Sequence, residues 1–90
     1  MIKLMDFLSR IEFIDKLIRE RATGNATTLA SKLNISKRTV FNYLKWMKKR
    51  GAPIVYSKAD GSYIYKREAV FVIAFVSYEI KRIIEELKNQ

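Results

Sequence analysis

The chain has 90 residues, about half of them apolar, and its 18 basic and nine acidic side chains give a net charge of +9. This predicts one small globular domain, and the basic excess favours a nucleic acid or an acidic membrane surface as partner. Cysteine and histidine are absent, which excludes disulfides and a Ser-His or Cys-His nucleophile. The acids form no ligand-like cluster, so we expect no metal, no cofactor and no enzymatic activity.

No stretch of the sequence predicts export or membrane insertion. The start of the chain is too short for a signal peptide and is interrupted by Lys3 and Asp6. The longest apolar run, residues 69–76, has eight residues, whereas a spanning helix needs about 20. We therefore expect a cytoplasmic protein.

The first 21 residues predict one amphipathic helix. Its apolar residues recur at spacings of three and four: Leu4, Phe7, Leu8, Ile11, Ile14, Leu17 and Ile18. We expect this stripe to cover the core. Gly24 then predicts the break that follows the helix.

Residues 26–51 predict two helices joined by a tight turn. The first has the apolar stripe Ala26, Leu29, Ala30 and Leu33. Ser36 is a good N-cap for the second helix, which carries Val40, Leu44 and Met47 on one side. At about 100° per residue, the opposite side holds Arg38, Thr39, Asn42, Lys45, Trp46 and Lys49. This order of elements is a helix-turn-helix.

The charge of this region is one-sided. From Arg21 to Ala59 the sequence has nine basic residues and no Asp or Glu. A solvated helix surface usually mixes both signs, because oppositely charged neighbours stabilise it. A basic surface without acids therefore favours a polyanion such as DNA.

A β-hairpin is predicted after the second of these helices. Residues 54–57 and 62–66 are rich in β-branched and aromatic side chains, and Asp60-Gly61 between them is a strong turn signal. Lys58 would lie at the tip of this hairpin. We expect Tyr56, Tyr63 and Tyr65 to pack on the helices rather than stack on bases.

Several of these features together resemble a known family. They are Thr23-Gly24, Leu29-Ala30, Leu33, Ile35-Ser36, Arg38-Thr39-Val40, Leu44 and residues 51–54. Over about residues 10–65 the chain resembles the winged-helix DNA-binding domain of DeoR-type and related bacterial transcription regulators. The resemblance implies an α+β fold with a three-helix core and a hairpin wing. Phe41 and Tyr43 stand where the family usually has polar residues, and its ligand-binding domain is absent here, so we expect no small-molecule ligand.

The last third of the chain is the most hydrophobic. Residues 69–76 are uniformly apolar, which favours a third strand before a helix over residues 77–88, although one helix over 68–87 is an alternative. We predict a DNA-binding domain at 1–67 and a dimerisation element at 68–90, because the apolar surface exceeds what so small a core needs.

We therefore expect a sequence-specific, double-stranded DNA-binding protein, a small transcription regulator acting as a homodimer. Arg38 and Asn42 are the candidate base readers. The candidate phosphate contacts are Ser36, Lys37, Thr39, Lys45, Lys49 and Lys58. Trp46 has two possible roles, packing on the first helix or contacting sugars, and we favour packing. Alternatives are a winged-helix protein-interaction module without DNA contact, and single-strand or RNA binding through aromatic stacking.

Overall fold

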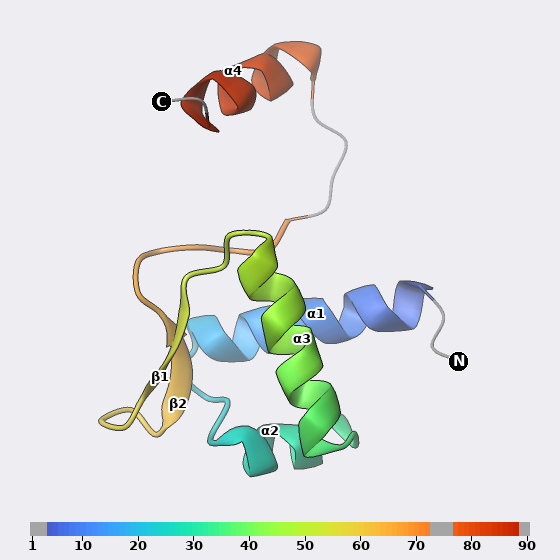
Figure 1. Ribbon diagram of the computed structural model, residues 1–90, viewed down its shortest axis with the longest axis vertical. Helices are drawn as coiled ribbons and strands as arrows, with labels where there is room; N and C mark the ends of the chain where they lie inside the picture. Colours follow the sequence, from blue (N-terminus) through green and yellow to red (C-terminus); the bar gives the residue numbers. More distant parts are fainter. Residues whose placement is uncertain (1–3, 73–76, 89–90) are drawn as a thin grey trace.

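The computed structural model describes residues 4–72 and 77–88, and it contains four helices and one hairpin within these ranges (Figure 1). The elements in chain order are α1 (Leu4–Arg19), α2 (Ala26–Leu33), α3 (Lys37–Lys49), β1 (Ile54–Ser57), β2 (Ser62–Tyr65) and α4 (Tyr78–Lys88). Helices α1 to α3 pack together with the hairpin beside them, and α4 lies apart from this body (Figure 1). The predicted α+β winged helix is thereby confirmed.

One hydrophobic core lies among the three helices and the first strand. Helix α1 contributes Ile11, Ile14 and Ile18, which are buried as their spacing predicts. The main residues that meet them from the other elements are Leu29 of α2, Val40, Leu44 and Met47 of α3, and Ile54 of β1. Burial of each such side chain contributes roughly 1.5–3 kcal/mol, so this cluster dominates the stability of the domain.

Both helices of the helix-turn-helix begin at a side-chain cap. The Asn25 side chain accepts a hydrogen bond from the Thr28 backbone N–H at 2.9 Å, and Ser36 accepts one from Thr39 at 3.0 Å. The predicted N-cap at Ser36 is confirmed. Between the helices, Asn34 adopts φ 55°, which ends α2 and turns the chain toward α3.

The hairpin is antiparallel and is attached to the loop between α1 and α2. Ile54 pairs with Tyr65 and Ser57 with Ser62, so the turn contains residues 58–61, as predicted. The buried hydroxyls of Thr23 and Ser62 lie 2.9 Å apart, and Arg21 contacts Asp60 in the turn at 2.9 Å. Hydrogen bonds from Ser57 and Arg21 lower the pKa of Asp60. These contacts hold the hairpin against the helical core.

A buried carboxylate, Asp15 of α1, connects the C-terminal side of the hairpin to the core. It accepts hydrogen bonds from the Tyr65 hydroxyl at 2.6 Å and from the Phe71 backbone N–H at 3.1 Å, and it pairs with Arg19 at 3.1 Å. The pKa of Tyr65 is raised by its burial and by its bond to Asp15. The segment after β2 is therefore anchored to α1 as far as Phe71.

The predicted third strand is not present in the described part of residues 69–76. Residues 69–72 have no regular secondary structure, which also excludes one helix over 68–87, and residues 73–76 lie outside the described ranges. A uniformly apolar run has no periodicity, so local sequence could not decide its conformation. The helix expected over 77–88 is confirmed as α4. Within the described ranges, no helix is long and apolar enough to cross a bilayer.

Candidate nucleic-acid interface

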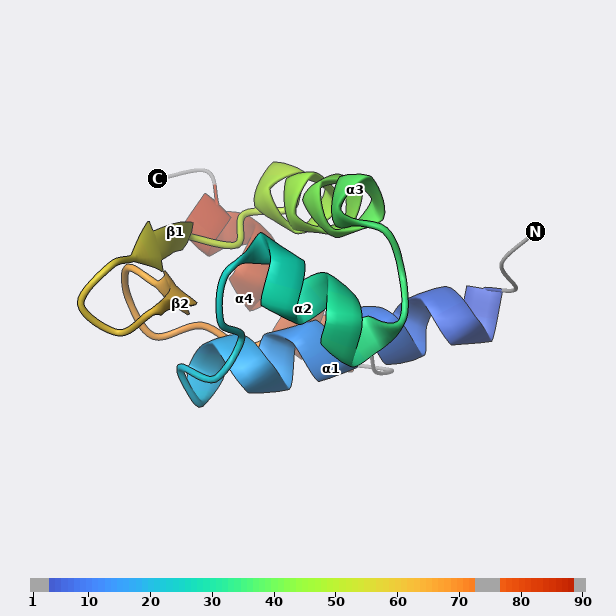
Figure 2. The same ribbon diagram turned by 90° about the horizontal axis from the view of Figure 1, so that it is seen from below.

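Helix α3 has one buried and one exposed side. Val40, Tyr43, Leu44 and Met47 face the core. The predicted contact residues Lys37, Arg38, Asn42, Lys45 and Lys49 are all exposed. Figure 2 shows α3 at one side of the domain, with α1 at the opposite side and the hairpin at one end. The exposed side of α3 thus presents basic and amide groups to solvent without any acid among them.

The first turn of α3 adds two hydroxyl groups to this surface. Ser36 is exposed and Thr39 half-buried, and their side-chain oxygens lie 2.8 Å apart. Ser36 also accepts the Thr39 backbone N–H, so its first role is to begin the helix. Because this cap fixes the first turn, it also fixes the position from which Lys37 and Arg38 project.

Lys58, the predicted contact on the hairpin, is exposed in the turn between β1 and β2. The Arg21–Asp60 ion pair and the hydrogen bond from Ser57 to Asp60 at 2.8 Å constrain this turn. The hairpin turn that carries this lysine is therefore held on the domain, and the hairpin lies to one side of α3 (Figure 2).

A hollow of about 270 Å³ lies between the start of α2, α3 and the hairpin. Its lining includes Phe41, which is 48% exposed, together with Lys37, Tyr56 and Tyr63. Sequence reasoning did not include the hollow in the site, although Phe41 is unusual for the family. The hairpin register pairs Tyr56 with Tyr63, but no local signal predicts that Phe41 lies beside them, because the hollow depends on how the hairpin docks against α2 and α3.

The expectation that all three hairpin tyrosines pack on the helices is wrong for Tyr56. Tyr63 and Tyr65 pack against the core, whereas Tyr56 is exposed and meets the Tyr63 ring edge-on, with centroids 5.1 Å apart. Burial, and to a lesser extent Tyr56, raise the pKa of Tyr63. The Tyr56 side chain thus lies open to solvent at the edge of the hollow.

Trp46 does not belong to the exposed side of α3 on which its helical angle placed it. It is half-buried, with its ring centroid 5.0 Å from that of Phe7 and 6.2 Å from that of Phe71. The Arg50 guanidinium lies 3.8 Å from the indole centroid. The packing role for Trp46 is confirmed. The Arg50 guanidinium is held by stacking on the indole and by a hydrogen bond that it donates to the Trp46 carbonyl oxygen at 3.2 Å.

Tyr43, the other unusual residue in α3, is buried in the core, and Arg10 donates a hydrogen bond to its hydroxyl at 3.1 Å. Tyr43 therefore differs from the family pattern at a core position and not on the exposed side of α3. Of these two residues, Phe41 is the one that changes the composition of the exposed surface.

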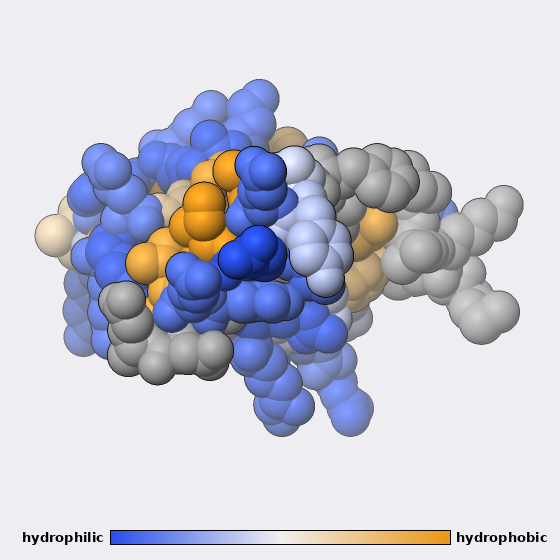
Figure 3. All heavy atoms as spheres, turned by 90° about the horizontal axis from the view of Figure 1, so that it is seen from above, coloured by the Kyte–Doolittle hydropathy of each residue, from blue (hydrophilic) through white to orange (hydrophobic). Residues whose placement is uncertain are grey.

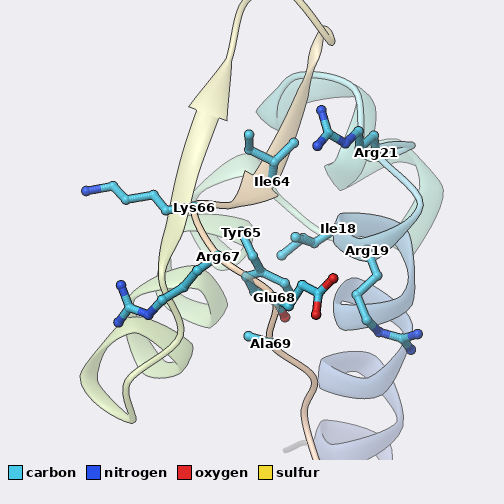
Figure 4. A pocket seen from close by; sticks show the side chains of 9 residues that line it. All are labelled: Ile18, Arg19, Arg21, Ile64, Tyr65, Lys66, Arg67, Glu68 and Ala69. Atoms are coloured by element: carbon cyan, nitrogen blue, oxygen red, sulfur yellow. The ribbon is translucent and has the colours of Figure 1, made fainter.

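A larger hollow, about 520 Å³, lies between the end of α1 and the segment that follows β2 (Figure 4). Glu68 points into this space, whereas Lys66 and Arg67 extend away from α1 (Figure 4). The two α1-side cations, Arg19 and Arg21, are already paired with Asp15 and Asp60. Among the described residues that line it, the hollow thus lacks a convergent set of free charges for an anionic ligand.

The three-helix core, the hairpin and the exposed basic helix together define a winged helix-turn-helix, a DNA-binding class of domain. A family model described as "HTH domain" matches residues 10–61, more than half of the chain, and the chain belongs to that family. The match supports a DNA-binding, transcription-regulatory role. The DeoR-type subclass stays a prediction. No curated protein and no solved structure matches the chain.

Proposed function

We propose that the protein is a sequence-specific, double-stranded DNA-binding regulator that acts as a homodimer and places α3 in the major groove. The observation that carries this proposal is the exposed side of α3, where basic and amide side chains occur without an acid. A major groove accommodates one α-helix, and the helix in it reads base edges with a few side chains near its N-terminus.

Arg38 and Asn42 are the proposed base readers. They are exposed and four residues apart, so they lie one turn apart on the same side of α3. A guanidinium matches the two acceptors of guanine, and an amide matches the donor and acceptor of adenine. Each such pair discriminates against a wrong base by about 1–3 kcal/mol.

The remaining candidate residues are proposed to bind phosphates. Lys37, Lys45 and Lys49 flank the base readers, and the Ser36 and Thr39 hydroxyls lie at the start of the helix. Lys58 on the hairpin would contact the backbone beside the groove. Contacts of this kind position the domain on any duplex and do not select a sequence.

We propose that residues 1–67 form the DNA-binding domain and that residues 68–90 form a C-terminal extension that acts as a dimerisation element. The support is the exposure of the apolar residues in α4, which a monomer leaves in water. A two-fold dimer would recognise an inverted repeat, with half-sites about 34 Å apart or a multiple of that distance.

A selection from random duplexes, followed by affinity measurements at one salt concentration, tests the DNA-binding proposal. Arg38→Ala and Asn42→Ala should each weaken binding to the selected site about 5- to 150-fold, with little change on random DNA. Lys45→Ala is the matched control, because it removes a charge from the same side of α3 and should weaken both duplexes alike.

Equal losses on both duplexes from Arg38→Ala would exclude it as a base reader. The selection could also enrich no duplex sequence while the protein binds single strands or RNA tightly. That result would contradict duplex recognition and support the aromatic-stacking alternative.

A further inference from the structure

Helix α4 exposes a complete apolar stripe. Its members, Ile80, Ile83, Ile84 and Leu87, are between 41% and 63% exposed. Figure 3 looks down on this end of the molecule and shows hydrophobic side chains gathered between hydrophilic ones. The helix lies apart from α1–α3 and the hairpin (Figure 1). Four large apolar side chains on one side of one helix fit the packing surface of another helix.

The two edges of this stripe carry opposite charges. At about 100° per residue, Glu79 and Glu86 border the stripe on one edge, and Lys81 borders it on the other. Arg82 and Glu85 lie farther from the stripe, and Glu85 forms an exposed ion pair with Lys81 at 3.8 Å, a kind of pair that is weak in water. The occupant of the stripe should therefore present an apolar stripe with a basic edge opposite Glu79 and Glu86, and an acidic edge opposite Lys81.

A second copy of α4 offers these matching edges only when the two helices run parallel. When two helices pack in parallel about a two-fold axis, each edge of one helix meets the other edge of its partner. The acidic edge then meets the basic edge on both sides of the pair. In an antiparallel pair, each edge meets its own equivalent, so acids would meet acids and Lys81 would lie near basic groups.

We infer that α4 pairs in parallel with α4 of a second copy of the chain. The inference rests on the proposed homodimer and specifies its interface and orientation. Ile80 and Leu87 lie about two turns apart, with Ile83 and Ile84 between them, so the stripe runs along most of α4. A parallel pair also places both DNA-binding domains at the same end, where they reach one duplex together.

The pairing is weak without DNA. Helix α4 has 11 residues and is therefore about 16 Å long, which gives an interface smaller than the roughly 800 Å² per partner of stable complexes. Self-association is expected at protein concentrations on the order of 100 µM, and binding of both domains to one operator strengthens it.

Disulfide trapping tests the orientation, because the chain has no cysteine of its own. In a parallel pair, Ile80→Cys faces its equivalent and should form a covalent dimer under mild oxidation. In an antiparallel pair the two introduced thiols would lie about 10 Å apart along the axis, beyond the reach of a disulfide. Arg82→Cys, on the far side of α4, is the matched control and should stay monomeric.

Charge reversal tests the edges, with sedimentation of the native chain as the measurement. Lys81→Glu makes both edges acidic, and Glu79→Lys/Glu86→Lys makes both basic, so each variant alone should associate about tenfold more weakly than wild type. An equimolar mixture of the two should regain association, because acidic edges then meet basic ones.

Several results would overturn the inference: an Ile80→Cys chain that stays monomeric, a three-chain assembly, or charge variants that associate like wild type. The first is also the result expected if α4 docks on its own domain. Binding of the same variants to a single half-site reports separately on α3, so a failed α4 pairing leaves DNA recognition intact, and loss of DNA binding leaves the covalent dimer intact.

Discussion

Asp15 shows how one residue joins distant parts of this chain. Only 2% of its surface is exposed, and a buried carboxylate is stable only when donors surround it. The donors come from residues 4, 50 and 56 positions away along the chain, namely Arg19, Tyr65 and Phe71. Asp15 is therefore the point at which the hairpin and the C-terminal segment are attached to α1.

The bond between Tyr65 and Asp15 predicts a loss of stability in alkali. Because the pKa of Tyr65 is raised in the folded protein, its contribution is fully present below the unfolded value of 10.0 and is lost as the pH rises above it. Tyr65→Phe should cost roughly 1.5–3 kcal/mol near neutral pH, and its difference from wild type should shrink above about pH 10. Urea unfolding at a series of pH values measures this. Tyr78→Phe, at an exposed position, is the control, and a constant difference up to about pH 11 would contradict the prediction.

The first turn of α3 contributes both to the stability of the fold and to the surface proposed to bind DNA. Ser36→Ala removes the cap and should cost about 1 kcal/mol of unfolding free energy. Ser36→Asp keeps an acceptor for the Thr39 N–H and adds a negative charge at a helix N-terminus, so stability should be retained or raised.

The same two variants should rank differently in DNA binding. Ser36→Asp puts an acid beside Lys37 and Arg38, so it should bind duplex more weakly than Ser36→Ala although it is the more stable protein. Unfolding curves and fluorescence anisotropy on a labelled duplex give the two rankings. Equal ranks in both assays would show that Ser36 acts only through the stability of α3.

The local elements of this fold were predictable, because each depends on periodicity or on a turn signal. Ile11, Ile14, Leu17 and Ile18 of α1 are buried as expected, and so is most of the stripes of α2 and α3. The cap at Ser36 and the Asp60-Gly61 turn also occur as expected. Residues 69–72 could not be assigned, since an apolar run suits a strand, a helix or an irregular segment equally well.

The candidate site was less predictable where its residues depend on distant partners. Trp46 has a helical angle close to that of the basic residues, but the rings of Phe7 and Phe71 hold it against the core. Tyr56 has the composition of a packed strand residue, yet it is exposed beside Phe41. No local pattern encodes either outcome, because both follow from how the elements dock.

For the whole molecule, the charge distribution predicts a steep salt dependence of DNA binding. The four proposed phosphate-contacting lysines, Lys37, Lys45, Lys49 and Lys58, should each release about one counterion. The slope of log K against log salt should then be about −4 per chain, and each Lys→Ala change should reduce it by about one. Anisotropy titrations over a series of salt concentrations measure the slope. An affinity that barely changes with salt would exclude this basic surface as the contact with DNA.

Trp46 also gives the protein an optical reporter of its own. It is the single tryptophan of the chain, and it lies where α1, α3 and the segment at Phe71 meet, under the Arg50 guanidinium. Its emission therefore reports whether that junction is closed, without any attached dye. The indole lies off the surface proposed for DNA, so its emission reports detachment of the C-terminal segment and not occupancy of α3. Recorded together with the anisotropy of a labelled duplex, it separates the two events in a single titration.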